Sequence, residues 1–120
     1  MTISLTAVLL IIWAHWIGDF ILQSDYHAQN KSKNSFILGE HVFLYSIPLA
    51  CIGLFIPVSL VWVFFNAVAH FCTDWITSRI TSKLWAKKQV HWFFVTIGAD
   101  QAIHFTTLFV SYVFLLPYMR

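Results

Sequence analysis

Histidine and aspartate occur together four residues apart at three places in this sequence, and these pairs have the clearest chemical meaning. The pairs are His15 and Asp19, His70 and Asp74, and Asp100 and His104. A spacing of four places both members of a pair on one face of a helix. Neutral imidazole and carboxylate are ligands of divalent ions such as zinc, manganese and iron. The spacing therefore predicts a metal centre assembled from three helices.

Further polar residues complete the predicted site. His41 adds another imidazole ligand, whereas the adjacent Glu40 points about 100° away around a helix, so the two side chains cannot both point straight inward. Glu40 or an aspartate, Asp100 foremost, is the candidate general base. The residues expected to bind substrate, and to orient a phosphate head group at the mouth of the site, are Gln23, Lys31, Lys33 and Gln101.

The composition indicates a membrane protein. The 120 residues are 59% hydrophobic and only 10% charged, whereas ordinary soluble domains are about 25% charged. Too little polar surface is present to cover a small soluble globule, and the same composition excludes disorder. A net charge of +2 also argues against binding to nucleic acid. We therefore expect one integral membrane domain over residues 1–120.

Four apolar segments are long enough to cross a bilayer, which requires about 20 residues per helix. They cover residues 3–22, 36–56, 57–76 and 92–116. The expected fold class is all-α, an integral membrane four-helix bundle with antiparallel neighbours. An acidic side chain inside a span costs on the order of 2.5–3.5 kcal/mol. The acidic residues within these spans therefore require a compensating role.

Basic residues concentrate in two connections between the spans. Residues 23–35 and 77–91 contain Lys31, Lys33, Arg79, Lys83, Lys87 and Lys88. The positive-inside rule places both connections in the cytoplasm and both termini outside. With this orientation, every polar set inside the spans lies in the cytoplasmic half of the bundle. Unrelated packing contacts would have no reason to share one depth, so the convergence favours a common site.

The second basic connection has a helical pattern of its own. Ile76, Ile80 and Leu84 recur every four residues, and basic residues follow the same spacing on a neighbouring strip. The pattern predicts either an amphipathic helix lying at the cytoplasmic interface or a helical continuation of the third span. In both arrangements the basic face could meet anionic lipid head groups.

A short internal repeat relates the two halves of the chain. Residues 15–21 and 70–76 both read histidine, aromatic, two further residues, aspartate, aromatic, isoleucine. The repeat predicts two helical hairpins related by a pseudo-twofold axis along the membrane normal, with the site on that axis. No lysine or arginine is expected within the spans. Two divalent ions about 3.5–4 Å apart could therefore be balanced by the carboxylates of Asp19, Glu40, Asp74 and Asp100.

The ordered motifs resemble a known family. They read His15-x-x-Gly18-Asp19-Phe20-x-Leu22-Gln23, a lysine at Lys33, His41, His70-Phe71-x-x-Asp74 and Asp100-Gln101-x-x-His104. This set, which covers nearly the whole chain, is similar to small bacterial and phage membrane proteins known as domain of unknown function 3307. The resemblance implies a bacterial inner-membrane protein, with periplasmic or extracellular termini in the orientation above, and no established activity. A looser similarity is to inner-membrane metal-dependent hydrolases, which also place histidine and aspartate pairs on short membrane helices.

The leading functional hypothesis is a metal-dependent hydrolase acting on a lipid or another amphiphilic phosphate ester at the cytoplasmic leaflet. The alternative is a divalent-cation or proton transporter, although the outer halves of the spans are almost wholly apolar. Haem ligation by two histidine pairs, and a structural or phage-interaction role in which the polar cluster fixes packing, stay open. A homo-oligomer is a further hypothesis, since so short a chain has few residues with which to bury its polar face.

Overall fold

The computed structural model describes residues 2–119 and contains helices but no strand within them. The elements, in chain order, are α1 (Leu5–Trp16), the π-helix η1 (Ile17–Ile21), α2 (Asp25–Asn30), α3 (Ser35–Cys51), the 3₁₀-helix η2 (Ile52–Leu54), α4 (Leu60–Ala86), α5 (Val90–Leu115) and the 3₁₀-helix η3 (Leu116–Tyr118). The predicted all-α class is therefore confirmed.

Several of these helices are both long and apolar. Within the described residues, three stretches are long and apolar enough to cross a membrane, namely Ser35–Leu54, Leu60–Ala86 and Val90–Tyr118. The stretch Leu5–Ile21, which joins α1 and η1, is apolar but shorter. Only 17% of the most apolar window of Val90–Tyr118 is buried. Most of its apolar side chains therefore face outwards, as a surface in contact with lipid requires.

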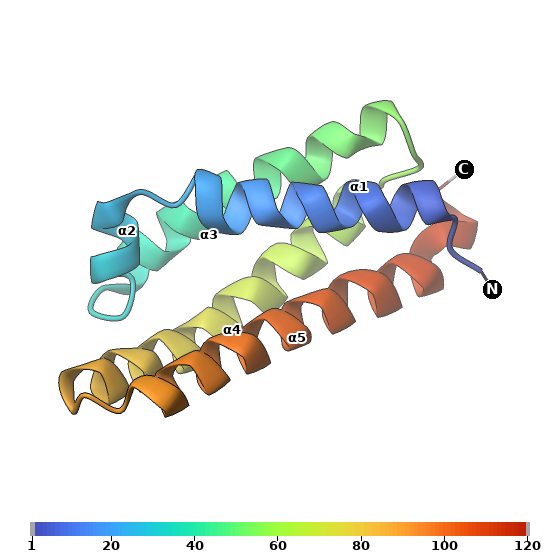
Figure 1. The fold of residues 1–120 in the computed structure, drawn as a ribbon. Helices are drawn as coiled ribbons and strands as arrows, with labels where there is room; N and C mark the ends of the chain where they lie inside the picture. The colour runs from blue at the N-terminus through green and yellow to red at the C-terminus, as the bar shows by residue number, and fades with distance from the viewer. Residues whose placement is uncertain (1, 120) are drawn as a thin grey trace.

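The helices pack so that segments far apart in the sequence meet in the middle of the molecule. α4 and α5 lie side by side as an antiparallel pair, and α3 packs against both α4 and η1. α1 runs alongside α3, and α2 contacts α3 near its start (Figure 1). The two termini lie at one end of the molecule, whereas α2 and the α4–α5 turn lie toward the other. Both basic connections are thus at the same end.

Polar side chains explain where α1 and α4 begin. The Ser4 hydroxyl accepts a hydrogen bond from the Ala7 N–H at 3.1 Å, and the Ser59 hydroxyl accepts one from the Trp62 N–H at 3.1 Å. Each bond satisfies a backbone donor that the first helical turn leaves without a partner. Because of the cap at Ser59, α4 begins at Leu60 and not at residue 57 as the hydropathy pattern predicts.

α4 continues without a break to Ala86, well beyond the predicted end of the third span at residue 76. The connection with the repeated isoleucines is thus the continuation of this helix. It is not a separate amphipathic helix lying at the interface, which was the other arrangement that its pattern allowed. Lys88 has a φ of 59° and reverses the chain in the left-handed region before α5 begins at Val90.

The interior is divided along the bundle. Toward the end that holds the termini, apolar and aromatic side chains form a hydrophobic core that includes Ile11, Leu49, Trp62, Leu108 and Tyr112. The neighbouring part of the interior is polar instead. Its buried side chains are His15, Asp19, His41, His70, Asp74, Asp100 and His104. The fold therefore gathers the residues that the sequence singles out for metal chemistry.

Candidate metal centre

Asp19 reaches the interior from a π-helical turn. The π-helix Ile17–Ile21 ends the first apolar stretch, and such turns occur frequently at functional sites. Gly18 lets this turn approach α3 closely, since a Cβ on Gly18 would lie 2.8 Å from the Tyr45 carbonyl oxygen. A larger residue could occupy that position only if one of the helices moved. Gly18 thereby sets how close Asp19 comes to α3.

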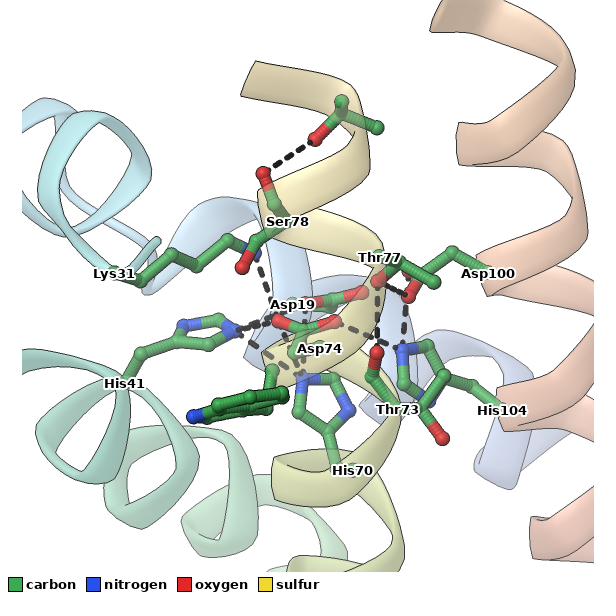
Figure 2. A network of polar contacts seen from close by, with 12 residues as sticks. Asp19, Lys31, His41, His70, Thr73, Asp74, Thr77, Ser78, Asp100 and His104 are labelled. Carbon is green, nitrogen blue, oxygen red and sulfur yellow. Dashed lines mark hydrogen bonds and ion pairs between the residues drawn. The ribbon is translucent and has the colours of Figure 1, made fainter. Parts of the chain in front are cut away.

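Four buried side chains from η1, α3 and α4 bring one ligand atom each to a common point. His41 Nε2 lies 3.1 Å from Asp19 Oδ1 and 3.2 Å from His70 Nε2. It also lies 3.5 Å from Asp74 Oδ2. His70 Nε2 lies 3.4 Å from both Asp19 Oδ1 and Asp74 Oδ2. Figure 2 shows these side chains pointing toward one another from different helices.

Five of the six separations between these four atoms match the edges of a tetrahedron around a metal ion, and the sixth is no more than 4.8 Å. With zinc–nitrogen and zinc–oxygen bonds of about 2.0–2.1 Å, the ligand atoms of a tetrahedral site lie about 3.3–3.4 Å apart. The five separations above run from 3.1 to 3.5 Å and bracket that value. The Nε2 atoms of His41 and His70 lie 3.2 Å apart, so they cannot both carry hydrogen. A cation between them can accept a lone pair from each nitrogen. The donor set therefore fits a divalent ion.

A second group overlaps the first at Asp19. It joins Asp19 to Asp100 and His104 on α5, and its ligand atoms lie within 4.8 Å of one another. His104 Nε2 lies 3.1 Å from Asp100 Oδ2 and 3.2 Å from Asp74 Oδ1. The Thr77 hydroxyl donates a hydrogen bond to Asp100 Oδ1 at 2.6 Å, which orients this carboxylate (Figure 2). The second group thus adds candidate ligands from α5 to the centre.

His15 is the predicted metal ligand that lies in neither group. Its Nε2 lies 3.6 Å from Asp19 Oδ2 but only 2.7 Å from Gln101 Oε1. Its Nδ1 lies 2.9 Å from the Tyr45 hydroxyl. Both ring nitrogens are thus already paired, and His15 stays a predicted ligand that the structure places beside the two groups. It holds Gln101, whose amide nitrogen donates to Asp19 Oδ2 at 2.9 Å.

Lys31 enters the centre from the connection between α2 and α3. Its Nζ lies 2.8 Å from Asp74 Oδ2, and its side chain is only 16% exposed. The expectation that no basic side chain neutralises the acidic residues in the spans is therefore wrong. The long side chain of lysine reaches a buried carboxylate from a backbone position outside the spans. Lys31 offsets one of the three aspartate charges in the centre.

Glu40 lies apart from the other predicted residues. Its side chain is 47% exposed, and its carboxylate lies 3.8 Å from His27 Nε2 on α2. Neighbouring positions on a helix point about 100° apart, and His41 takes the inward direction. The structure therefore places Glu40 outside the two ligand groups, and its role as a general base stays a prediction. Asp100 is the other candidate for that role, and it lies in the second group.

An open cavity of about 720 Å³ leads to the carboxylates. Asp19, Asp74 and Asp100 all line it. The predicted substrate-binding residues also line it, and they are Gln23, Lys31, Lys33 and Gln101. Most of the apolar part of the lining comes from α4 and α5, with Trp85, Phe93, Phe94 and Ile97. One cavity therefore combines carboxylates, lysines and an apolar surface.

Tyr45 and Thr77 contribute to the centre although the motifs do not single them out. The Tyr45 ring stacks on the His70 ring with their centroids 3.9 Å apart, and Thr77 holds Asp100. Tyr45 lies four residues after His41, and Thr77 lies three residues after Asp74. Residues at these spacings share a helix face. This shared face is the signal by which both could have been found.

The fold and the centre define a class of protein, one that is all-helical, has apolar outward faces, and contains buried histidine and aspartate groups able to hold a metal ion. Residues 5–119 match the family described as Protein of unknown function (DUF3307), and the chain belongs to that family. No curated protein and no solved structure matches the chain. The family resemblance of the motifs is thereby confirmed, and the looser similarity to inner-membrane hydrolases stays a prediction.

Proposed function

We propose that this chain is an integral membrane hydrolase that requires a divalent metal ion and acts on an amphiphilic phosphate ester. The observation that carries the proposal is the set of five separations of 3.1–3.5 Å among the ligand atoms of Asp19, His41, His70 and Asp74. Imidazole and carboxylate in this arrangement suit zinc, and also manganese or iron.

The cavity beside these ligands has the features that such a substrate needs. Lys31 and Lys33 bring positive charge to its polar side, where they bind the phosphate oxygens. The aromatic side chains from α4 and α5 accept the alkyl chain. Asp100 receives the proton of the attacking water, and Thr77 keeps that carboxylate in place. A divalent ion bound in the centre supplies Lewis-acid activation of the phosphoryl group.

The proposed location is the cytoplasmic leaflet of a bacterial inner membrane. The apolar outward faces of α3, α4 and α5 support insertion. The basic residues near the end of α4 favour a cytoplasmic position for this end, and therefore periplasmic or extracellular termini. Arg79 lies 3.8 Å over the Trp75 ring, a pairing suited to the membrane interface. The same basic residues would attract anionic lipid head groups.

Transport of a cation or proton is the weaker alternative. A transporter must expose its site in turn to both sides of the membrane, and a polar path must lead there. Between the centre and the end with the termini lie buried side chains of the hydrophobic core, among them Ile11, Leu49, Trp62 and Leu108. This core supports a centre that is reached from one side, as a hydrolase needs.

The first test is the metal content of the detergent-purified protein, measured by elemental mass spectrometry. We expect zinc, manganese or iron in the wild-type protein and its loss in His70→Ala and Asp74→Asn. Glu40→Gln is the matched control, because it removes an acidic side chain from α3 outside the centre. A folded wild-type protein that stays free of metal after incubation with each ion would overturn the proposal.

The second test is hydrolysis of two phosphomonoesters that differ only in chain length, dodecyl phosphate and propyl phosphate, by the protein in nanodiscs. Each buried methylene contributes about 0.8 kcal/mol, so we expect kcat/KM to favour dodecyl phosphate by at least about tenfold. Release of phosphate should be lost in His70→Ala and kept in Glu40→Gln. If the protein hydrolysed neither ester and also failed to hydrolyse phosphatidic acid in vesicles, this substrate class would be excluded.

A further inference from the structure

We infer that the centre holds two divalent ions in unequal positions, which are bridged by the carboxylates of Asp19 and Asp74. One position is closed and is completed by His41 and His70. The other is open to the cavity and is completed by Asp100 and His104. The inference rests on the proposed function for its chemistry, and it adds which residues divide the two positions.

The bridging follows from the way these two carboxylates face both sets of ligands. Asp74 Oδ2 faces His41 at 3.5 Å and His70 at 3.4 Å, whereas Asp74 Oδ1 faces His104 at 3.2 Å. Asp19 belongs to both groups of ligands. Its Oδ1 faces His41 at 3.1 Å, and its Oδ2 accepts a hydrogen bond from Gln101 at 2.9 Å. Paired ions held in this way lie about 3.5–4 Å apart.

The two positions differ in their access to the cavity. The shared Asp19 and Asp74 line it. Of the residues that complete the two positions, His41, His70 and His104 are almost fully buried and do not line it, whereas Asp100 does. A closed position is typical of ions that are held permanently. A position with an open side, where water or substrate can bind, is typical of ions that take part in catalysis. The ion beside Asp100 is therefore the one that a substrate can reach.

The charge of the centre fits a second ion once a phosphate ester is bound. Three aspartates and Lys31 carry a net charge of minus two when the histidines are neutral, and one divalent ion balances it. A second divalent ion leaves two positive charges. A phosphate monoester carries a charge of about −1.5 to −2 at neutral pH. A bound phosphate ester would therefore neutralise the net charge of the centre with two ions. Two ions suit that class of substrate for this reason.

The experiment is a titration of protein that has been stripped of metal by a chelator and kept in detergent. Zinc is followed by calorimetry, and Mn²⁺ is followed by electron paramagnetic resonance. We expect about two equivalents in the wild-type protein and a spin-coupled manganese pair, as ions about 3.5–4 Å apart require. Asp100→Asn and His104→Ala should each bind about one equivalent, with the spectrum of an isolated ion.

Controls separate these outcomes from misfolding. Glu40→Gln should keep both equivalents, and the conservative Asp100→Asn should keep the helical circular dichroism of the wild-type protein. Binding of a single equivalent by the wild-type protein, or two equivalents without spin coupling, would overturn the inference. So would an Asp100→Asn variant that still binds the coupled pair.

The result also distinguishes this inference from the proposed function. A coupled pair without hydrolysis of any phosphate ester would keep the two positions and exclude the hydrolase. Hydrolysis with one bound ion would keep the hydrolase and exclude the second position.

Discussion

The Nε2 atoms of His41 and His70 face each other at 3.2 Å, and the Nδ1 atom of each ring is buried without a hydrogen-bond partner among residues 2–119. Metal-ligating histidines usually gain a partner at the second nitrogen, which holds the ring in place. Here the packing of neighbouring rings, such as Tyr45 on His70, replaces that bond. A cation bound between the two Nε2 atoms would therefore help to fix the orientation of the pair.

The first prediction concerns metal and thermal stability. Zinc at a free concentration of 100 times its Kd should stabilise the wild-type protein by about 2.7 kcal/mol and raise its Tm. His41→Ala should lose this response, because it removes an atom common to three of the five short separations. Glu40→Ala should keep it. Circular dichroism melting in detergent, with and without a chelator, measures the effect, and an equal rise in His41→Ala would contradict it.

The second prediction concerns the close approach at Gly18. Gly18→Ala should lower the free energy of unfolding by about 1–3 kcal/mol, as overpacking does, because the new Cβ would lie 2.8 Å from a backbone oxygen of α3. Gly98→Ala is the matched control, since nothing lies within 4 Å of a Cβ added at Gly98 and alanine stabilises a helix relative to glycine. Unfolding in mixed detergent micelles gives both values. Equal effects of the two substitutions would show that the approach is not tight.

The third prediction concerns Lys31. Lys31→Met should lower kcat/KM for dodecyl phosphate at least about tenfold, since a charge-assisted hydrogen bond contributes about 1.5–3 kcal/mol. The bound metal should stay, because Lys31 supplies no lone pair to an ion. Lys87→Met removes a lysine outside the cavity lining and should leave the kinetics unchanged. Steady-state kinetics and elemental analysis of the same samples test this. Loss of metal in Lys31→Met would assign Lys31 to the assembly of the centre and not to substrate binding.

The fourth prediction concerns the apolar lining of the cavity. Phe94→Ser should weaken the preference for dodecyl over propyl phosphate, because it replaces an aromatic surface in the cavity with a hydroxyl. Phe64→Ser is the matched control, since Phe64 is also exposed but does not line this cavity. The readout is the ratio of the two kcat/KM values. If Phe64→Ser changed that ratio as much as Phe94→Ser does, the alkyl chain would not lie in the cavity.

The fifth prediction concerns orientation. In a Cys51→Ser, Cys72→Ser background, Lys88→Cys at the α4–α5 turn should react with a membrane-impermeant maleimide in inside-out vesicles only. Thr2→Cys should react in right-side-out vesicles only. The expectation follows from the concentration of basic residues at the turn. The reversed labelling pattern would place the cavity on the opposite face of the membrane.

The sequence alone predicted most of the centre, because its signals are local. Histidine and aspartate four residues apart share a face on any helix, and Asp74 and His104 are indeed both buried. The choice of His41 over Glu40 was open, because adjacent residues compete for the inward direction. Only the packing of α3 against α4 and η1 decides it.

The features that the sequence did not predict depend on distant contacts. His15 is paired with Tyr45 and Gln101, which come from two other helices, and it lies beside the ligand groups. Lys31 reaches Asp74 from the connection between α2 and α3. Sequence periodicity does not predict the path of such a connection. The end of the third helix was ambiguous because an amphipathic surface helix and a helical continuation have the same pattern of apolar residues. Its start depended on the cap at Ser59.

The division of the interior into a hydrophobic core and a polar centre has a consequence for how the protein matures. The core around Trp62 and Tyr112 joins α1, α3, α4 and α5 without any contribution from the ligands. Helix packing through this core can therefore be complete before any ion binds, so that binding of an ion would be a separate, later step. The cavity would then be the route of entry for the ion as well as for the proposed substrate.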